Sequence, residues 1–363
     1  MSKNRRFAFT FVTLLVLFLC FEGAARVFGV CACHAPVPST GSWQEMQADK
    51  RYLWRLTPNY VIRGPDGGST TINALGLRDS FLPREKAKNE RRILTTGDSS
   101  VYGWGVPEGR TYQEVLESGL NRTFPQYRFE VINLGVPGYS SVQSLRLLDD
   151  VGWSYQPDML MVSNIFSDCN IDTFQDEKAL AMVNVDDSPL HHSRTYCAMW
   201  NLYAQWYSTS NQERNRVLMP GVPRDTTILE KVDQVVDLSR VPLTRYLENL
   251  ETMRTVASAH GAGMMLVPLA QEWDVGQWSV PSLARPVPGQ VLPWHPYRKA
   301  MAQYASTHSL PLVSMPDAFG QAKASGRRLF NDPVHPSPDG AAVMAEALLQ
   351  YFSAHPESLQ VTR

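Results

Sequence analysis

Between residues 92 and 354, short apolar stretches alternate with longer amphipathic ones. The apolar stretches have the length of buried strands, whereas the segments between them repeat apolar residues at three- and four-residue intervals, as helices do. Strands are expected at 92–96, 129–134, 159–164, 263–270 and 311–315. Helices are expected from Thr111 onward and at 141–153, 243–261, 297–310 and 340–354. Such alternation predicts an α/β fold in which helices cover both faces of a parallel sheet.

The amino-terminal segment differs from the rest of the chain. Lys3, Arg5 and Arg6 precede an uncharged apolar run at 7–21, and Glu22 then ends the run. A basic start followed by an apolar stretch is typical of a secretion signal or a signal anchor. Extended past Glu22, the run approaches the roughly 17–25 residues of a membrane span. We favour an uncleaved anchor with its basic end in the cytoplasm, with a cleaved signal as the alternative.

The remaining sequence divides into a few parts. The anchor is expected at 1–26, a linker at 27–50, a β-rich lead-in at 51–85 and the main domain at 86–358. Within the main domain, residues 171–240 are polar and irregular and are expected to be an insertion. Both interpretations of the amino terminus place the main domain outside the cytoplasm, on the periplasmic or extracellular side.

Charge and cysteine content exclude some classes of function. Lys plus Arg number 34 and Asp plus Glu number 35, which gives a net charge of −1 and argues against a nucleic-acid partner. Cys31 and Cys33 are too close for an unstrained bridge, and no second cysteine pair completes a zinc site. Cys169 and Cys197 either pair in an oxidising compartment or stay free thiols. No motif predicts a metal or a cofactor.

Polar and glycine-rich loops follow the first three expected strands. Their sequences are Gly97–Ser100, Gly135–Gly138 and Asn164–Asn170. The carboxyl ends of parallel strands share one edge of the sheet, where ligands bind in such folds. A fourth polar segment, Asp332–His335, comes just before the last expected helix. We therefore expect these segments to form one site.

The four segments contain the groups that acyl transfer requires. Ser99, on a tight turn, can act as the nucleophile, and its own N–H can face the crevice. His335 can act as the general base, and Asp332 can orient its ring through the other nitrogen. Gly138 has no Cβ, so its N–H can approach an oxyanion closely.

Three of these stretches resemble a known family. ILTTGDSSVYGWGV, VINLGVPGYSSVQ and LFNDPVHPSPDGAAVMAEAL are similar to the first, second and fifth sequence blocks of the SGNH (GDSL-type) hydrolases, and the resemblance spans roughly residues 75–355. It implies a flavodoxin-like three-layer α/β/α fold and ester chemistry without a cofactor. It also implies that Ser99, Asp332 and His335 form a catalytic triad. Ser99 and Gly138 would donate to the oxyanion, and Asp98 would support the site.

The third block departs from the family pattern. The family has G-x-N-D after the third strand, and the asparagine side chain donates to the oxyanion. Counted without a gap, that asparagine position falls on Ser167, and Asp168 follows it. A hydroxyl can also donate one hydrogen bond. Asn170 or Asn164 would serve as the third donor if the loop has another shape.

Of three functions considered from the sequence, we favour the first and keep the other two as alternatives. The first is an extracytoplasmic serine esterase or deacetylase that acts on an acylated small molecule or glycan through an acyl-enzyme on Ser99. The second is an O-acyltransferase that passes the acyl group to a cell-envelope or exported polysaccharide. The third is a non-catalytic scaffold on the same fold. The membrane, through the amino-terminal segment, is the other expected partner.

Overall fold

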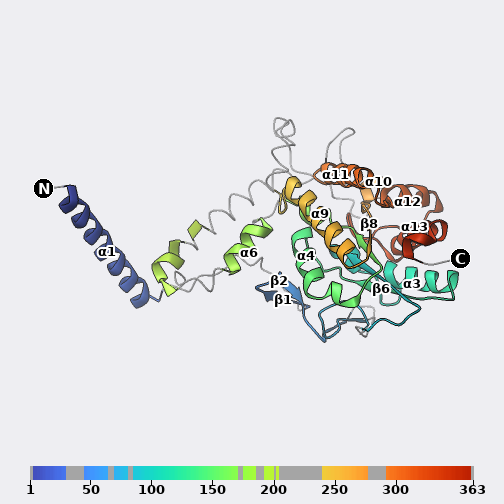
Figure 1. The fold of residues 1–363 in the computed structure, drawn as a ribbon, viewed down its shortest axis with the longest axis horizontal. Helices are drawn as coiled ribbons and strands as arrows, with labels where there is room; N and C mark the ends of the chain where they lie inside the picture. Colours follow the sequence, from blue (N-terminus) through green and yellow to red (C-terminus); the bar gives the residue numbers. More distant parts are fainter. Residues whose placement is uncertain are drawn as a thin grey trace.

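The computed structural model describes residues 3–29, 45–63, 69–80, 85–170, 175–184, 192–199, 202–203, 239–276 and 292–360. Most of the expected insertion at 171–240 therefore lies outside the described residues. Figure 1 shows a layered main body, with the helix α1 lying apart from it at the amino-terminal end of the chain.

A parallel four-stranded sheet forms the centre of the main body. Its strands are β5 (Glu90–Thr96), β6 (Arg128–Asn133), β7 (Met159–Val162) and β8 (Gly263–Leu266), in the order β6-β5-β7-β8. The second strand along the chain thus lies beside the first, and the third lies on its other side, as in flavodoxin-like folds. The connections after β5 lead first to β6 on one side and then to β7 on the other, so the topological switch point lies between β5 and β7. In folds of this kind, ligands bind in the crevice beyond the carboxyl ends of these two strands.

The expected fifth strand at 311–315 is shorter than predicted. Leu312 forms only an isolated parallel bridge to Leu266, supported by hydrogen bonds from Leu266 N to Pro311 O and from Val313 N to Leu266 O. A helix, α12 (Met315–Ala322), begins immediately afterwards, with Ser314 as its N-cap and Pro316 in its first turn. These helix-start residues therefore end the strand, and α12 was not among the helices expected from the sequence.

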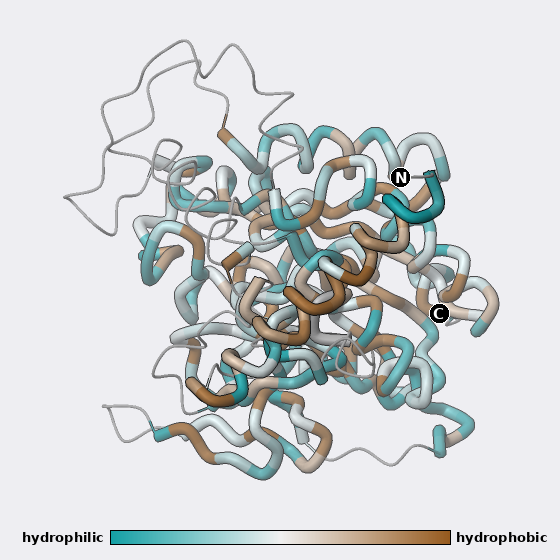
Figure 2. Tube along the Cα trace, turned by 90° about the vertical axis from the view of Figure 1, so that its left-hand side faces the viewer, coloured by the Kyte–Doolittle hydropathy of each residue, from teal (hydrophilic) through white to brown (hydrophobic). Residues whose placement is uncertain are grey.

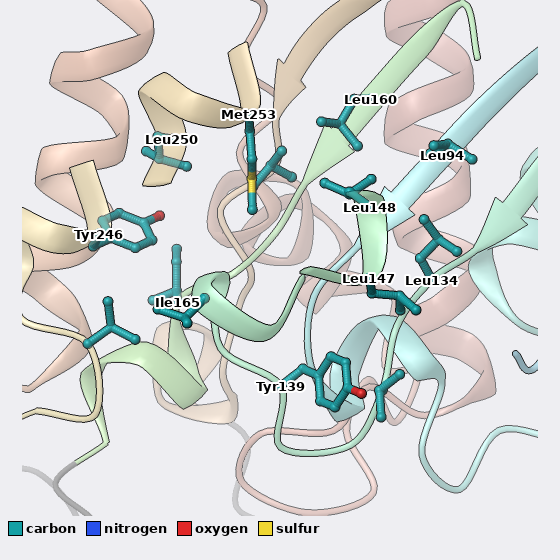
Figure 3. Packing of buried hydrophobic residues seen from close by; sticks show 14 of the residues in the cluster. Leu94, Leu134, Tyr139, Leu147, Leu148, Leu160, Ile165, Tyr246, Leu250 and Met253 are labelled. Atoms are coloured by element: carbon teal, nitrogen blue, oxygen red, sulfur yellow. The ribbon is translucent and has the colours of Figure 1, made fainter. Parts of the chain in front are cut away.

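Side chains of the sheet alternate between two cores, as the pleat requires. One core contains Leu94, Leu160 and Met264, and the other contains Ile93 and Met159. The first core packs against α4 (Ser141–Asp150), α9 (Leu243–Ala259) and α11 (Trp294–Thr307), and the second against α3 (Tyr112–Thr123), α12 and α13 (Pro338–Ala354). Figure 3 shows the first core, with Leu148 of α4 and Met253 of α9 near Leu160 of the sheet. The predicted three-layer α/β/α arrangement is confirmed.

Short helical elements complete the described chain. They are α2 (Ser99–Tyr102), η1 (Gly152–Tyr155), α5 (Phe166–Cys169), α6 (Asp176–Asn184), α10 (Glu272–Val275), η5 (Lys323–Ser325) and η6 (Pro356–Leu359). The helix expected at 141–153 thus ends at Asp150, and η1 follows it as a tighter turn. A capping box begins α3, because Thr111 accepts from the Glu114 N–H while the Glu114 carboxylate accepts from the Thr111 N–H.

Two antiparallel hairpins form the lead-in before the sheet. The first pairs β1 (Met46–Asp49) with β2 (Leu53–Leu56), and the second pairs β3 (Val61–Arg63) with β4 (Ser69–Thr71). The strand β1 lies in the segment that was expected to be a linker. Trp54 of β2 is buried in the same core as α4, so the first hairpin is packed onto the main domain.

The outer strand β6 has its free edge closed by side chains. The backbone N–H groups of Phe129, Val131 and Asn133 donate to Asn121 Oδ1, Glu117 Oε2 and Asp79 Oδ2, at 2.9, 2.9 and 2.7 Å. An open edge offers unpaired backbone groups to other chains. Here the lead-in and α3 satisfy these donors.

The helix α1 (Lys3–Val27) is longer than the expected apolar run, and none of its residues is buried. It is long and apolar enough to cross a membrane, although a secretion signal meets the same criterion. In Figure 2 the labelled amino-terminal end is hydrophilic. Near its other end, the Glu22 carboxylate accepts hydrogen bonds from Ser193 Oγ and from the N–H groups of Arg194 and Thr195. These N–H groups open a short helical segment at 194–199, which Glu22 caps.

The pairing considered for Cys169 and Cys197 is wrong. Cys169 is a free, buried thiol, and its Sγ lies 3.4 Å from the Phe166 carbonyl. Cys197 is disulfide-bonded, with a partner outside the described residues. Cys20, in α1, is free and exposed.

Candidate active site

Ser99 is the first residue of α2, at the carboxyl end of β5. Asp98 caps this helix in an extended conformation and accepts a 3.0 Å hydrogen bond from the Ser100 N–H. Asp98 is buried, whereas Ser99 is partly exposed. Within the described part of the chain, the Ser99 N–H has no acceptor. Among the described residues, the fold therefore leaves the Ser99 N–H available to a ligand.

His335 joins Ser99 to Asp332 in one hydrogen-bonded chain. Its Nε2 lies 2.7 Å from Ser99 Oγ, and its Nδ1 lies 2.6 Å from Asp332 Oδ2. The turn that holds these groups is built locally. Asp332 Oδ1 accepts from the N–H groups of Val334 and His335, and the His335 carbonyl accepts from the Asn331 N–H. A carboxylate three residues before the histidine thus folds the turn and contacts the ring.

The environment of Asp332 keeps it ionised. Partial burial acts to raise its pKa, but the hydrogen bond and charge of His335, together with the N–H groups of Val334 and His335, outweigh burial and hold the pKa below its ordinary value. A carboxylate on Nδ1 favours the tautomer with its proton on that nitrogen. Nε2 then has a lone pair for the Ser99 hydroxyl proton.

Contacts from the first loop hold the His335 turn in place. Ser100 Oγ donates to the Val334 carbonyl at 3.1 Å, and Asn331 Nδ2 donates to the Gly105 carbonyl at 3.2 Å. The Trp104 ring lies with its centroid 6.1 Å from that of His335. These contacts tie the segment before α13 to the segment after β5 and support the Ser99–His335 geometry.

The second loop lies beside the first. The Val136 N–H donates to the Gly97 carbonyl at 3.2 Å. This hydrogen bond joins the two loops two residues before Ser99 in the first loop and two residues before Gly138 in the second. Gly138 has φ +77°, and a Cβ there would lie 3.0 Å from Trp54 Cζ2. The position therefore requires glycine. The Gly138 N–H donates to no acceptor in the described ranges, which leaves it available to a ligand.

The three candidates for a third donor have different surroundings. Ser167 is buried, and both its N–H and its Oγ lie 3.3 Å from Asp98 Oδ2. Asn164 is buried with its amide engaged, because Nδ2 donates to Ser144 Oγ and Oδ1 accepts from Thr96 Oγ1. Asn170 is exposed at the far end of α5. Ser167 is thus the candidate tied to the Ser99 turn.

Asp98 links the first and third loops. Burial raises its pKa above the ordinary value, against the hydrogen bonds of Ser100 and Ser167 and the charge of His335. When ionised it accepts only, so the Ser167 hydroxyl donates to it. Asp168, the residue after Ser167, is also buried and accepts from the Ser141 N–H of α4.

Other features of the described chain lie apart from this site. A cavity of about 690 Å³ between the lead-in and α3 is lined by residues such as Asn73, Asp79 and Gln113, and by none of Ser99, Asp332 and His335. Among the described residues, no group of three or more His, Cys, Asp or Glu side chains is placed to hold a metal ion.

Two residues near the site had no sequence signal. Trp54 reaches the Gly138 loop from the lead-in, and Arg240 reaches it from the end of the expected insertion. Both are far from Gly138 along the chain, and neither belongs to a motif. Only tertiary contacts bring them there.

No protein-family model matches the chain, and no curated protein matches it. Among solved structures, the chain is similar to a two-domain esterase active on acetylated mannans, with 17% identity and a TM-score of 0.42 over 73% of this chain and 49% of that one. This chain thus spans about half the length of the two-domain esterase. It is also similar to an acetylxylan esterase from Geobacillus stearothermophilus, with 15% identity and a TM-score of 0.42, over 73% and 95% of the two chains.

Proposed function

We propose that the chain is an SGNH-type serine esterase that hydrolyses an acyl ester through an acyl-enzyme on Ser99. The observation that carries the proposal is the continuous chain from Asp332 through His335 to Ser99, with contacts of 2.6 and 2.7 Å. A scaffold would have no need of a hydroxyl, an imidazole and a carboxylate in this order.

The reaction has two balanced halves. In the first, Ser99 Oγ attacks the ester carbonyl while its proton passes to His335 Nε2, and the carbonyl oxygen becomes an oxyanion. The N–H groups of Ser99 and Gly138 stabilise this oxyanion. The intermediate collapses, the alcohol leaves with the proton from His335, and an acyl-Ser99 ester remains. In the second half, water attacks this ester by the same path, which releases the carboxylic acid and restores the Ser99 hydroxyl.

The proposed substrate is an acylated small molecule or glycan outside the cytoplasm. Two observations support this location. The helix α1 has the length and composition of a membrane anchor, and Cys197 is disulfide-bonded, which is common in oxidising compartments. We infer that α1 remains as an anchor and that the main domain lies on the periplasmic or extracellular side.

The test uses the full-length protein in detergent with p-nitrophenyl acetate and an acetylated oligosaccharide. Wild type is expected to release acetate from both, and Ser99→Ala is expected to lose on the order of 10⁴-fold or more in kcat. Ser154→Ala is the matched control, because its hydroxyl donates to the Val151 carbonyl in η1, away from the site. Equal rates for Ser99→Ala and wild type would overturn the assignment. Acetyl transfer to an added unacetylated oligosaccharide, faster than hydrolysis, would instead identify an acyltransferase.

A further inference from the structure

The peptide unit between Pro137 and Gly138 has a dedicated hydrogen-bond donor on its carbonyl side. Trp54 Nε1, buried in β2 of the first hairpin, donates to the Pro137 carbonyl at 2.9 Å. In a trans peptide the C=O and N–H of one unit point in opposite directions. Trp54 therefore holds the carbonyl inward and directs the Gly138 N–H away from the hairpin.

The next peptide unit is held by a second, independent residue. Arg240 Nη1 donates to the Gly138 carbonyl at 2.7 Å. Its other nitrogens are occupied, because Nε and Nη2 lie 2.8 and 2.9 Å from the Asp176 carboxylate and Nη2 also donates to Gln143 Oε1 at 2.8 Å. The guanidinium carbon lies 5.3 Å from the centre of the Trp54 ring. The side chains of Trp54 and Arg240 thus also contact each other.

Arg240 is itself firmly placed. Its side chain is buried, its N–H donates to the Asn170 carbonyl at 2.8 Å, and its carbonyl accepts from the Asp176 N–H at 3.0 Å. The bidentate pair with Asp176 neutralises its charge. The geometry therefore gives Arg240 the role of fixing a peptide orientation, and not that of supplying positive charge to the site.

Gly138 needs such support because its own conformation is permissive. Glycine populates positive and negative φ about equally, so its φ of +77° is not enforced by a side chain. An oxyanion donor acts well only when it is oriented before the reaction begins. Hydrogen bonds to the carbonyls on both sides of the Gly138 Cα remove that freedom.

We propose that Trp54 and Arg240 are positioning residues that lock the Gly138 N–H toward the oxyanion formed at Ser99. They lie on the lead-in and at the end of the insertion, so the two additions to the α/β domain both serve the reaction. This inference rests on the proposed esterase function.

The variants are Trp54→Phe, which keeps an aromatic ring but removes the donor, and Arg240→Lys, which keeps the charge but cannot reproduce the forked contacts. Each is expected to lower kcat by about 10–100-fold with KM changed by less than about threefold. The double variant is expected to lose less than the product of the two, because both residues act on one donor. Affinity for an arylboronic acid, which forms a tetrahedral anion on Ser99, is expected to fall in parallel with kcat/KM.

Two matched controls separate positioning from stability. Tyr52→Phe also removes a donor from an aromatic ring of the same hairpin, but that hydroxyl bonds to Asp150 and not to the Gly138 loop. Arg92→Lys disturbs a buried ion pair with Glu90 at the amino-terminal end of β5, away from the site. Both controls are expected to lower the melting temperature and to keep kcat and boronic-acid affinity.

Each outcome bears on a different claim. If Ser99→Ala is inactive but folded Trp54→Phe and Arg240→Lys keep the wild-type kcat and boronic-acid affinity, the positioning proposal is wrong while the esterase stands. If one variant fails to fold, the other decides, since the two contacts lie on different peptide units. If Ser99→Ala keeps full activity, the esterase mechanism itself fails.

Discussion

Asp332 receives hydrogen bonds from the His335 ring and from two N–H groups of its own turn. In Asp332→Asn the amide oxygen can still accept from the backbone, so the turn is expected to persist. The uncharged amide no longer favours the tautomer with the proton on Nδ1. We expect kcat to fall by up to about 10⁴-fold.

Steady-state kinetics and a melting curve of Asp332→Asn check this prediction together. A folded variant that keeps its activity within about tenfold would show that Asp332 builds the turn and does not orient the ring.

For Ser167, in contrast to Asp332, we predict that substitution has only a small effect on kcat. Its hydroxyl lies against Asp98, so it is engaged before any ligand binds. Ser167→Ala is therefore expected to lower kcat by less than about tenfold, whereas loss of a true oxyanion donor costs roughly 10²–10³-fold. The measurement is kcat on p-nitrophenyl acetate. A loss above 10²-fold in a folded variant would show that the hydroxyl turns to the oxyanion during the reaction.

At the scale of single residues, the sequence was enough to predict the side chains that lie in short turns. Asp332 and His335 lie in one turn, and Ser99 follows a strand, so local spacing was enough. The surroundings of Ser167 could not be predicted, because they depend on how the third loop packs on Asp98. Trp54 and Arg240 could not be predicted either, since tertiary contacts alone place them beside Gly138.

The two carboxyl groups that accept hydrogen bonds at the edge of β6 make the free energy of unfolding depend on pH. Burial raises the pKa of Asp79 and of Glu117, each to about 7. Ordinary values are near 4, so between about pH 4 and pH 7 the folded chain binds more protons than the unfolded chain. The contribution of these groups to stability is therefore greatest at low pH and is lost as the pH rises through this window. A protonated carboxyl still accepts from the edge N–H groups through its carbonyl oxygen.

Glu117→Gln tests this account. The amide oxygen can accept from the Val131 N–H at every pH, so the variant is expected to be more stable than wild type by about 1 kcal/mol at pH 8 and equal to it at pH 4. Urea unfolding across this range measures the difference. Glu346→Gln, at an exposed carboxylate on α13, is the control and should show no such trend. If the difference in unfolding free energy between Glu117→Gln and wild type did not change with pH, the raised pKa of Glu117 would be contradicted.

Periodicity predicted the four strands of the sheet and five of the helices that pack on it, because each core helix has one buried face. The segment at 311–315 shows where this fails. Its apolar residues are compatible with a strand, but the N-cap at Ser314 and the proline after it start α12 instead. The lead-in shows a second limit, because β1 begins in a segment whose composition is typical of a linker.

For the whole molecule, the contacts of Glu22 with residues 193–195 join α1 to the described part of the insertion. A signal that is cleaved off would take this cap away. We expect the mature protein to keep α1, to stay in the membrane pellet after alkaline extraction, and to be digested by protease added to spheroplasts. Its intact mass is the direct measurement. A soluble mature chain that begins after Val27 would contradict the anchor.

The central claim is that Ser99 is a nucleophile activated by His335. The most direct measurement treats the full-length protein with diethyl p-nitrophenyl phosphate and maps the adduct by mass spectrometry of peptides. We expect one diethylphosphoryl group on Ser99 in wild type, with none on Ser100, and greatly slowed labelling in His335→Ala. No adduct in folded wild type, an adduct on another residue, or labelling of Ser99 at the same rate without His335 would contradict the account.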